Sequence, residues 1–231
     1  MYESNLPRNE LFINTKLWPT DFGKNVPNAF EIACQKLRVD YLDSYMIHFP
    51  AVPEEMGNSN AVLEETWREL EKLYDAEKIR ALGVSNFSCD DLENLLEICS
   101  IRPHIIQSEF HPCQNPFELR QLCNEVDITF CGYCPLAKGR ILHLDSITKI
   151  AKIHGKTPAQ ICIRWSIQNG VCAIPKSRKP VRIMENSMVF DFELTETEMH
   201  ELNNLHLKES LKVVNLSSIQ ERMDLPDGYK L

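Results

Sequence analysis

The stretch IRALGVSNFSCDDLENLL, residues 79–96, carries a strand signal followed directly by a helix signal. Its first six residues are mostly apolar and predict a buried strand that ends at the polar pair Ser85 and Asn86. Ser88 is followed three positions later by Asp91, the pattern of a capped helix N-terminus, and leucines then recur at helical spacing. The stretch therefore predicts one βα unit with polar groups at the strand's carboxyl end.

The same unit recurs along the chain, separated by amphipathic stretches long enough to be helices. The predicted strands are 11–16, 41–48, 79–84, 104–109, 128–133 and 171–175, and the runs end at Lys16, His48, Asn86, Gln107, Tyr133 and Lys176. Repeated βα units produce parallel strands whose carboxyl ends share one face. We predict an α/β fold of the (β/α)8 TIM-barrel type, here an incomplete barrel with about six of the eight parallel strands.

Three of the intervening helices have clear sequence signals. A helix is predicted over 25–38, with Ala29, Ile32, Ala33 and Leu37 on one face. Two others are predicted to begin at capping boxes, one at Thr157 with proline in the first helical position and one at Thr195.

Composition limits the class of protein. The chain has 231 residues, a formal net charge of −8 and nine cysteines. The acidic balance disfavours nucleic-acid partners and acidic membranes, and no apolar run reaches the ~18 residues of a membrane span. The odd, scattered cysteines and the lack of a signal-peptide pattern predict a reduced, cytoplasmic protein. We expect one domain over 1–205 and a C-terminal tail over 206–231.

The segment 174–186 is the most specific local signal. Four cations, Lys176, Arg178, Lys179 and Arg182, fall within seven residues, where a strand ends and a helix opens at Pro180. Helix N-termini and cationic side chains both favour a bound anion. A solvated basic loop is the alternative, but this position at the last strand end favours a phosphate site.

The other strand ends suggest further chemistry. A lysine such as Lys16 lowers the pKa of a neighbouring proton donor, and a neutral histidine such as His48 polarises a carbonyl oxygen. Ser85, Asn86 and Gln107 are hydrogen-bonding groups suited to a carboxamide, and Tyr133 offers a flat stacking face.

Two alternatives use other residues. Cys131 and Cys134 form a C-x-x-C pair, which allows thiol redox chemistry, although Pro135 and not a helix N-terminus follows it. Glu109, His111 and His48 could be combined into a metal site on paper, but Glu109-Phe-His111-Pro fits a turn better.

Seven segments, in order, resemble the aldo-keto reductases. They are LFINTKLW, DYLDSYMIHFP, IRALGVSNF, IIQSEFHP, GYCPLAKG, KTPAQICIRW and IPKSRKPVRIMENSMVFDFELTETEM, and the resemblance covers roughly residues 6–205. It implies a (β/α)8 barrel that reduces carbonyl compounds with NADPH and without metal.

The resemblance also implies roles for single residues. Lys16 is similar to the lysine that tunes a catalytic tyrosine, and His48 to the substrate-orienting histidine, with Phe49 where many relatives have tryptophan. The residues that would bind NADPH are Ser85, Asn86 and Gln107 at the nicotinamide carboxamide, Tyr133 stacked on its ring, Leu136 elsewhere on the cofactor, Lys176, Ser177 and Arg182 at the 2′-phosphate, and Glu185 and Asn186 at the adenine. Lys179 adds charge that favours NADP over NAD.

The family's first two strands, its catalytic aspartate and its catalytic tyrosine precede the strand that is 11–16 here. Tyr2 lies 14 positions before Lys16, which is about half the family's spacing, so it does not replace that tyrosine. About 60 residues, or two βα units, are expected to be missing. Two unpaired strand edges would then be open to another chain or to the tail.

Three hypotheses follow. The first is an NADPH-dependent aldehyde or ketone reductase in a shortened form, with reduced or absent turnover and a small-molecule carbonyl substrate. The second is a non-catalytic NADP-binding or regulatory module, and the third is a thiol redox protein using Cys131 and Cys134. The sequence leaves the particular carbonyl and the oligomeric state open.

Overall fold

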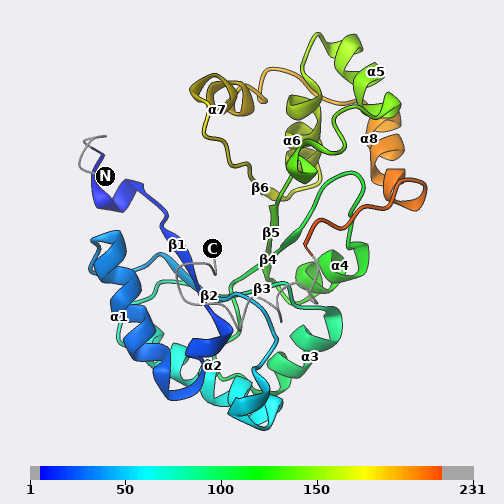
Figure 1. The fold of residues 1–231 in the computed structure, drawn as a ribbon. Helices are drawn as coiled ribbons and strands as arrows, with labels where there is room; N and C mark the ends of the chain where they lie inside the picture. Colours follow the sequence, from blue (N-terminus) through cyan, green and yellow to red (C-terminus); the bar gives the residue numbers. More distant parts are fainter. Residues whose placement is uncertain (1–5, 215–231) are drawn as a thin grey trace. The chain divides into compact units, whose positions relative to one another are not determined.

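The computed structural model describes residues 6–214 of the chain, and helices and strands alternate along it (Figure 1). The strands are β1 (Asn14–Leu17), β2 (Ser44–Ile47), β3 (Leu82–Ser85), β4 (Ile105–Glu109), β5 (Thr129–Tyr133) and β6 (Cys172–Ile174). The α-helices are α1 (Val26–Leu37), α2 (Ser59–Asp75), α3 (Cys89–Ile98), α4 (Phe117–Glu125), α5 (Asp145–His154), α6 (Pro158–Gln168), α7 (Pro180–Ser187) and α8 (Glu196–Asn203).

The chain divides into two compact units, which we describe separately. Among the described residues, unit 1 contains 6–106 and Glu125–Thr129, and unit 2 contains Gln107–Asn124 and 130–214. Strands β4 and β5 each contribute residues to both units. The single domain expected over 1–205 stays a prediction, and most of the expected tail, residues 215–231, lies outside the described residues.

Parallel strands form the centre of each unit. In unit 1, β1 pairs with β2 and β2 with β3, so that Lys16 lies opposite Met46 and Ile47 opposite Val84. In unit 2, Phe110 N donates to Tyr133 O, and β5 pairs in parallel with β6. The strand order is β1 to β6, as in the sequence. The prediction of an α/β fold of the (β/α) barrel type with six parallel strands is confirmed.

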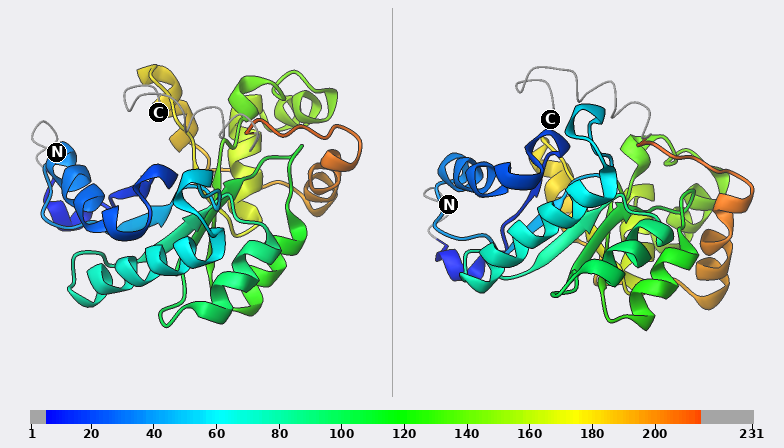
Figure 2. Two further views of the ribbon diagram at one scale, coloured as in Figure 1. Left: turned by 60° about the horizontal axis from the view of Figure 1, so that its bottom comes forward. Right: turned by 90° about the horizontal axis from the view of Figure 1, so that it is seen from below.

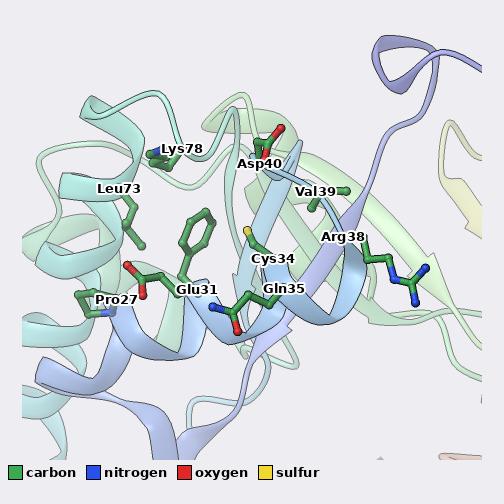
Figure 3. A pocket seen from close by; sticks show the side chains of 10 residues that line it. Pro27, Glu31, Cys34, Gln35, Arg38, Val39, Asp40, Leu73 and Lys78 are labelled. Atoms are coloured by element: carbon green, nitrogen blue, oxygen red, sulfur yellow. The ribbon is translucent and has the colours of Figure 1, made fainter.

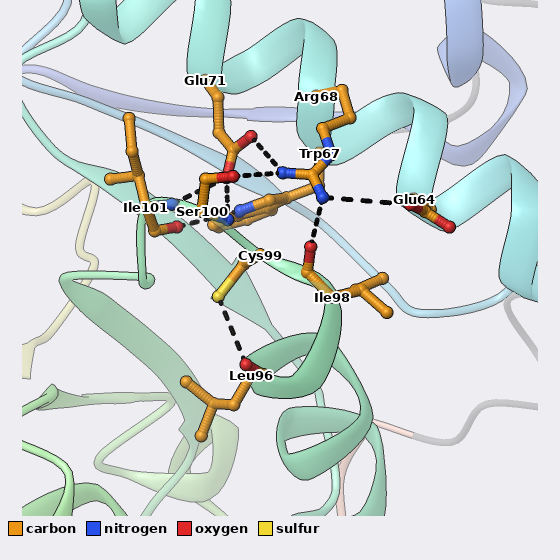
Figure 4. A network of polar contacts seen from close by, with 9 residues as sticks. All are labelled: Glu64, Trp67, Arg68, Glu71, Leu96, Ile98, Cys99, Ser100 and Ile101. Carbon is orange, nitrogen blue, oxygen red and sulfur yellow. Dashed lines mark hydrogen bonds and ion pairs between the residues drawn. The ribbon is translucent and has the colours of Figure 1, made fainter.

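Unit 1 has an apolar core covered by helices. Every residue of β2 and β3 is buried, as expected for strands with both faces covered. Helices α1 and α2 lie side by side (Figure 2). A carboxylate network joins α2 to the residues that follow α3 (Figure 4): Glu71 Oε1 accepts the N–H groups of Ser100 (2.7 Å) and Ile101 (2.8 Å), and Arg68 pairs with Glu71.

Unit 2 has a core of stacked rings. Trp165 of α6 stacks on Phe110 with ring centroids 4.4 Å apart, and Phe130 of β5 meets Phe110 edge-on. Helix α5 packs against both α6 and α8. The capping boxes predicted at Ser88, Thr157 and Thr195 are confirmed.

The structure differs from the sequence analysis in one helix and in the lengths of the strands. Helix α5 had no prediction, because its apolar residues, Ile147, Ile150 and Ala151, are few and no capping box marks its start. The predicted strands are longer than the observed ones, which have three to five residues each.

The predicted inner face of α1 is also wrong. Ile32 and Leu37 are exposed, and the helix instead buries Val26, Phe30 and Cys34. The large Phe30 ring sets the rotation of the helix by packing edge-on against Tyr45. The neighbouring face lines a shallow groove of about 430 Å³ between α1 and the end of α2, shown in Figure 3.

No α-helix in the described part of the chain is both long and apolar enough to cross a membrane.

Candidate functional site

The predicted catalytic pair lies in unit 1. Lys16 is in β1, and His48 directly follows β2, where its N–H donates to Leu17 O at 3.0 Å. The His48 ring stacks on Phe49 (centroids 4.6 Å apart), and Trp18 meets it edge-on at 5.3 Å. Burial, followed by the nearby positive charge of Lys16, lowers the pKa of His48 to about 4. The imidazole is therefore neutral at neutral pH.

Two predicted carboxamide ligands lie beside this pair. Asn86 Nδ2 donates to His48 O at 2.9 Å and to Ser85 Oγ at 3.1 Å. Asn86 has a φ of +64°, a left-handed conformation that asparagine tolerates better than most residues. Unit 1 thus brings Lys16, His48, Ser85 and Asn86 to the ends of β1, β2 and β3.

Gln107 is the predicted ligand in β4 and belongs to unit 2. Its side chain is buried, and its Oε1 atom has no hydrogen-bond partner among the described residues. A buried acceptor without a partner is destabilising unless a ligand or water supplies a donor. This atom therefore fits the N–H group of a carboxamide ligand.

A cavity of about 1030 Å³ contains most of the other predicted ligands. It lies within unit 2, between the loop after β5, the end of β6, and helices α6 and α7. The predicted cofactor residues that line it are Tyr133, Leu136, Lys176, Ser177, Arg182, Glu185 and Asn186. Burial, and then the charge of Glu109, raise the pKa of Tyr133, so its ring is a neutral wall of this cavity.

One side of the cavity is positively charged. Lys176 and Arg182 line it near the N-terminus of α7, where Ser177 Oγ accepts the N–H of Lys179 at 3.2 Å. Lys138 lines it as well. The sequence prediction missed Lys138, although its place in the loop after a predicted strand end could have signalled it.

The opposite end of α7 is fixed by the cap of α6. Thr157 Oγ1 donates to Glu185 Oε1 at 2.7 Å, and Gln160 Nε2 donates to Met188 O at 2.8 Å. The same two side chains form the capping box of α6. Glu185 is therefore held at the cavity wall with its second carboxylate oxygen outside this bond.

The C-x-x-C pair has little redox character. Cys131 is buried and its thiol donates to Cys172 O at 3.3 Å, while Cys134 adopts a φ of +56°. Burial raises the pKa of Cys134, which disfavours the reactive thiolate. The His111 backbone bridges to Gln114 in a turn, as its sequence suggests. In the described part of the chain, no group of three or more His, Cys, Asp or Glu side chains could hold a metal ion.

A sequence profile described as "Aldo/keto reductase family" matches residues 1–206. The chain belongs to this family. An uncharacterized oxidoreductase of Caenorhabditis elegans is 50% identical over 226 residues, which cover 98% of this chain and 70% of that protein. Glyoxal reductase of Bacillus subtilis is 43% identical over 208 residues, or 90% of this chain and 72% of that enzyme.

One similar solved structure contains NADPH. A variant of Gox0644 in complex with NADPH has a TM-score of 0.79 and 35% identity, and the match covers 86% of this chain and 71% of that one. Aldo-keto reductases are oxidoreductases that use NAD(P)H, so this chain is assigned to the oxidoreductases at the level of its family.

Each predicted site residue lies in one of the two units. Unit 1 holds Lys16, His48, Ser85 and Asn86, whereas unit 2 holds Gln107 and the residues of the cavity. Trp18, which meets the His48 ring, was missed because tryptophan in an apolar run is usually a core residue. Tyr2 lies outside the described residues.

Proposed function

We propose that this aldo-keto reductase binds NADPH and serves the reduction of a small aldehyde or ketone to the alcohol. The cationic cavity of unit 2 is the observation that carries the proposal. Lys138, Lys176 and Arg182 line it next to the N-terminus of α7. Cations and free helix N–H groups together favour a phosphate. NADPH has one phosphate more than NADH, so this charge favours NADP.

The remaining groups of unit 2 fit the rest of that cofactor. Gln107 Oε1, which is buried without a partner in the described part of the chain, would accept an N–H of the nicotinamide carboxamide. The Tyr133 ring would stack on the nicotinamide, and Glu185 and Asn186 would accept and donate hydrogen bonds at the adenine. When bound, NADPH supplies the hydride that reduces the carbonyl carbon.

The residues of unit 1 would act on the carbonyl oxygen. Neutral His48 can donate a hydrogen bond that polarises the carbonyl and orients it. Lys16 would favour the ionised form of a proton donor and so lower its pKa. The donor itself is not among the residues assigned from this sequence. Binding and turnover are therefore two separate properties of this polypeptide.

Cofactor binding is tested by titrating the protein with NADPH and with NADH while following nicotinamide fluorescence. We expect tighter binding of NADPH, and a loss of about tenfold in K176M and in R182M from the removed phosphate contact. K152M, which removes an exposed lysine of α5, is the matched control and should bind as the wild type does. Equal affinity of K176M/R182M and wild type would overturn the proposal.

A second candidate is a non-catalytic NADP-binding module. The observation that favours it is that the residues lining the cationic cavity all belong to unit 2, whereas Lys16 and His48 belong to unit 1. Measuring the oxidation of NADPH in the presence of glyoxal distinguishes the two candidates. Glyoxal is chosen because one relative is named glyoxal reductase. Tight binding with little or no turnover supports the module, and ordinary reductase rates support the enzyme.

We further propose a cytoplasmic location and a small-molecule carbonyl as the partner, with neither nucleic acid nor membrane. The nine cysteines are free thiols, as is usual in reducing compartments. Fractionation of cells that produce the chain would test the location.

A further inference from the structure

Glu109 is a buried carboxylate at the end of β4 that the proposed reaction does not use. Its side chain lies two residues after Gln107 in the same strand and is 2% exposed. Oε1 accepts Nε2–H of His111 at 2.9 Å and the N–H of Val213 at 2.6 Å, and Oε2 accepts the N–H of Val214 at 2.8 Å. One carboxylate therefore receives two successive backbone N–H groups from a segment 104 and 105 residues later in the chain.

These bonds are strong ones. Hydrogen bonds from N–H to an ionised carboxylate are shorter and stronger than neutral ones. Burial alone would raise the pKa of Glu109, but the hydrogen bonds from His111, Val213 and Val214 hold it below its usual range. Leu211 N also donates to Cys113 O at 3.0 Å, so the segment 211–214 is attached at both ends.

The attached segment forms part of the cationic cavity. Val214 lines this cavity together with Tyr133 and Lys176. The hydrogen bond from the Val214 N–H to Glu109 fixes the backbone from which the Val214 side chain extends. Without the carboxylate, two partly buried N–H groups lose their acceptor, and this wall of the cavity loses its attachment.

We propose that Glu109 is a positioning residue for the cofactor: it holds Val214 against the cavity and thereby slows the release of bound NADPH. The inference rests on the proposed binding of NADPH in this cavity. It assigns Glu109 no contact with the cofactor or with the reacting atoms. Its effect passes through the backbone of Val213 and Val214.

A purely structural role is the competing explanation, and Glu71 provides the matched control. Glu71 is also a buried carboxylate that accepts two successive backbone N–H groups, but those belong to Ser100 and Ile101 in unit 1. E71Q and E109Q make the same chemical change in similar surroundings. If Glu109 only stabilises the fold, both variants lose stability and neither changes the release of NADPH.

The test measures NADPH dissociation by stopped-flow fluorescence in wild type, E109Q, V214A and E71Q. E109Q should release NADPH about tenfold faster, V214A about threefold faster, and E71Q at the wild-type rate. V214A keeps both backbone N–H groups and removes only the wall, so it decides the matter if E109Q does not fold. Release rates within twofold of wild type for V214A, and for E109Q if it folds, would overturn the proposal.

Hydrogen exchange of the cofactor-free protein separates the two levels of the proposal. The amides of Val213 and Val214 should be protected in wild type and E71Q and should exchange faster in E109Q. If wild type binds no NADPH, the proposed function fails and the inference fails with it, whatever the exchange shows. If wild type binds NADPH but the amides are unprotected, the inference alone is overturned.

Discussion

Glu71 in unit 1 and Glu109 in unit 2 make similar hydrogen bonds, but they hold different kinds of segment. Each is a buried carboxylate that accepts two successive backbone N–H groups, and each has a cationic or imidazole partner, Arg68 or His111. Glu71 joins α2 to the chain after α3 (Figure 4), and its partners Arg68, Ser100 and Ile101 do not line the cationic cavity. Glu109 joins a strand end to a segment that lines the cationic cavity. The contacts alone do not decide a carboxylate's role; the segment it holds does.

The two units also differ in whether burial leaves a titratable side chain charged. Glu109 remains ionised when buried because N–H donors surround it, whereas His48 becomes neutral on burial. Acidification is therefore expected to weaken unit 1 partly through His48 and unit 2 partly through Glu109.

The largest effect is expected at His48. Its folded pKa of about 4 lies below the ordinary histidine value of 6.5, so between these values the unfolded chain binds a proton that the folded protein does not. Stability from this group is present above pH 6.5 and is lost as pH falls toward 4, by about 3 kcal/mol at most. Urea unfolding at several pH values should show this slope, and H48Q should flatten it. An unchanged slope in H48Q would contradict the assignment.

E71Q is expected to destabilise the protein by about 2 kcal/mol, because an amide offers only one acceptor oxygen to Arg68 and the two N–H groups. Urea unfolding at neutral pH measures this. NADPH affinity should stay at the wild-type value. A change in affinity as large as that in E109Q would erase the difference between the two carboxylates.

Acid should release the segment held by Glu109. The folded pKa of Glu109 is lowered from 4.5, so its stabilising contribution is present above that value and is lost as pH falls through the folded pKa. The expected size is about 1.5 kcal/mol, the lower end of the range for hydrogen bonds to a charged group. The stability difference between wild type and E109Q should therefore shrink below pH 4.5. A constant difference down to pH 2 would argue against an ionised Glu109.

The smallest effect compares two capping boxes of unit 2. T157A and T195A each remove an N-cap hydroxyl and should each cost about 1 kcal/mol. Only Thr157 also donates to Glu185 at the cavity, so T157A should weaken NADPH binding about threefold and T195A should not. Equal NADPH affinities in the two variants would show that Glu185 does not depend on the cap of α6.

Much of the fold was predictable because short-range sequence patterns indicate it. The three capping boxes and the six apolar runs are short-range signals, and the structure contains all of them. The inner face of α1 was not predictable, since small apolar residues lie on two sides and only the packing of Phe30 on Tyr45 selects one. Helix α5 was missed because it depends on contacts with α6 and α8 more than on its own pattern.

The site divides in the same way. Residues 176–186 were recognisable because their cations lie close together in sequence beside Pro180, and the cavity is lined by Lys176, Ser177, Arg182, Glu185 and Asn186 of this range. Trp18 was not recognisable, since nothing in its immediate neighbours distinguishes a site residue from a core residue, and the only signal for Lys138 was its place in the loop after a predicted strand end. The roles proposed for the site residues are tested by the binding experiments described above.

By itself the sequence determined the parallel βα class, the three helix starts with capping boxes and the family, because each depends on residues that are neighbours along the chain. The tertiary structure decided which face α1 buries, that the His48 imidazole is neutral, and that Glu109 meets Val213 and Val214 more than a hundred residues later. Burial and long-range hydrogen bonds exist only after the chain has folded, and they set both the pKa of a side chain and the position of a distant segment.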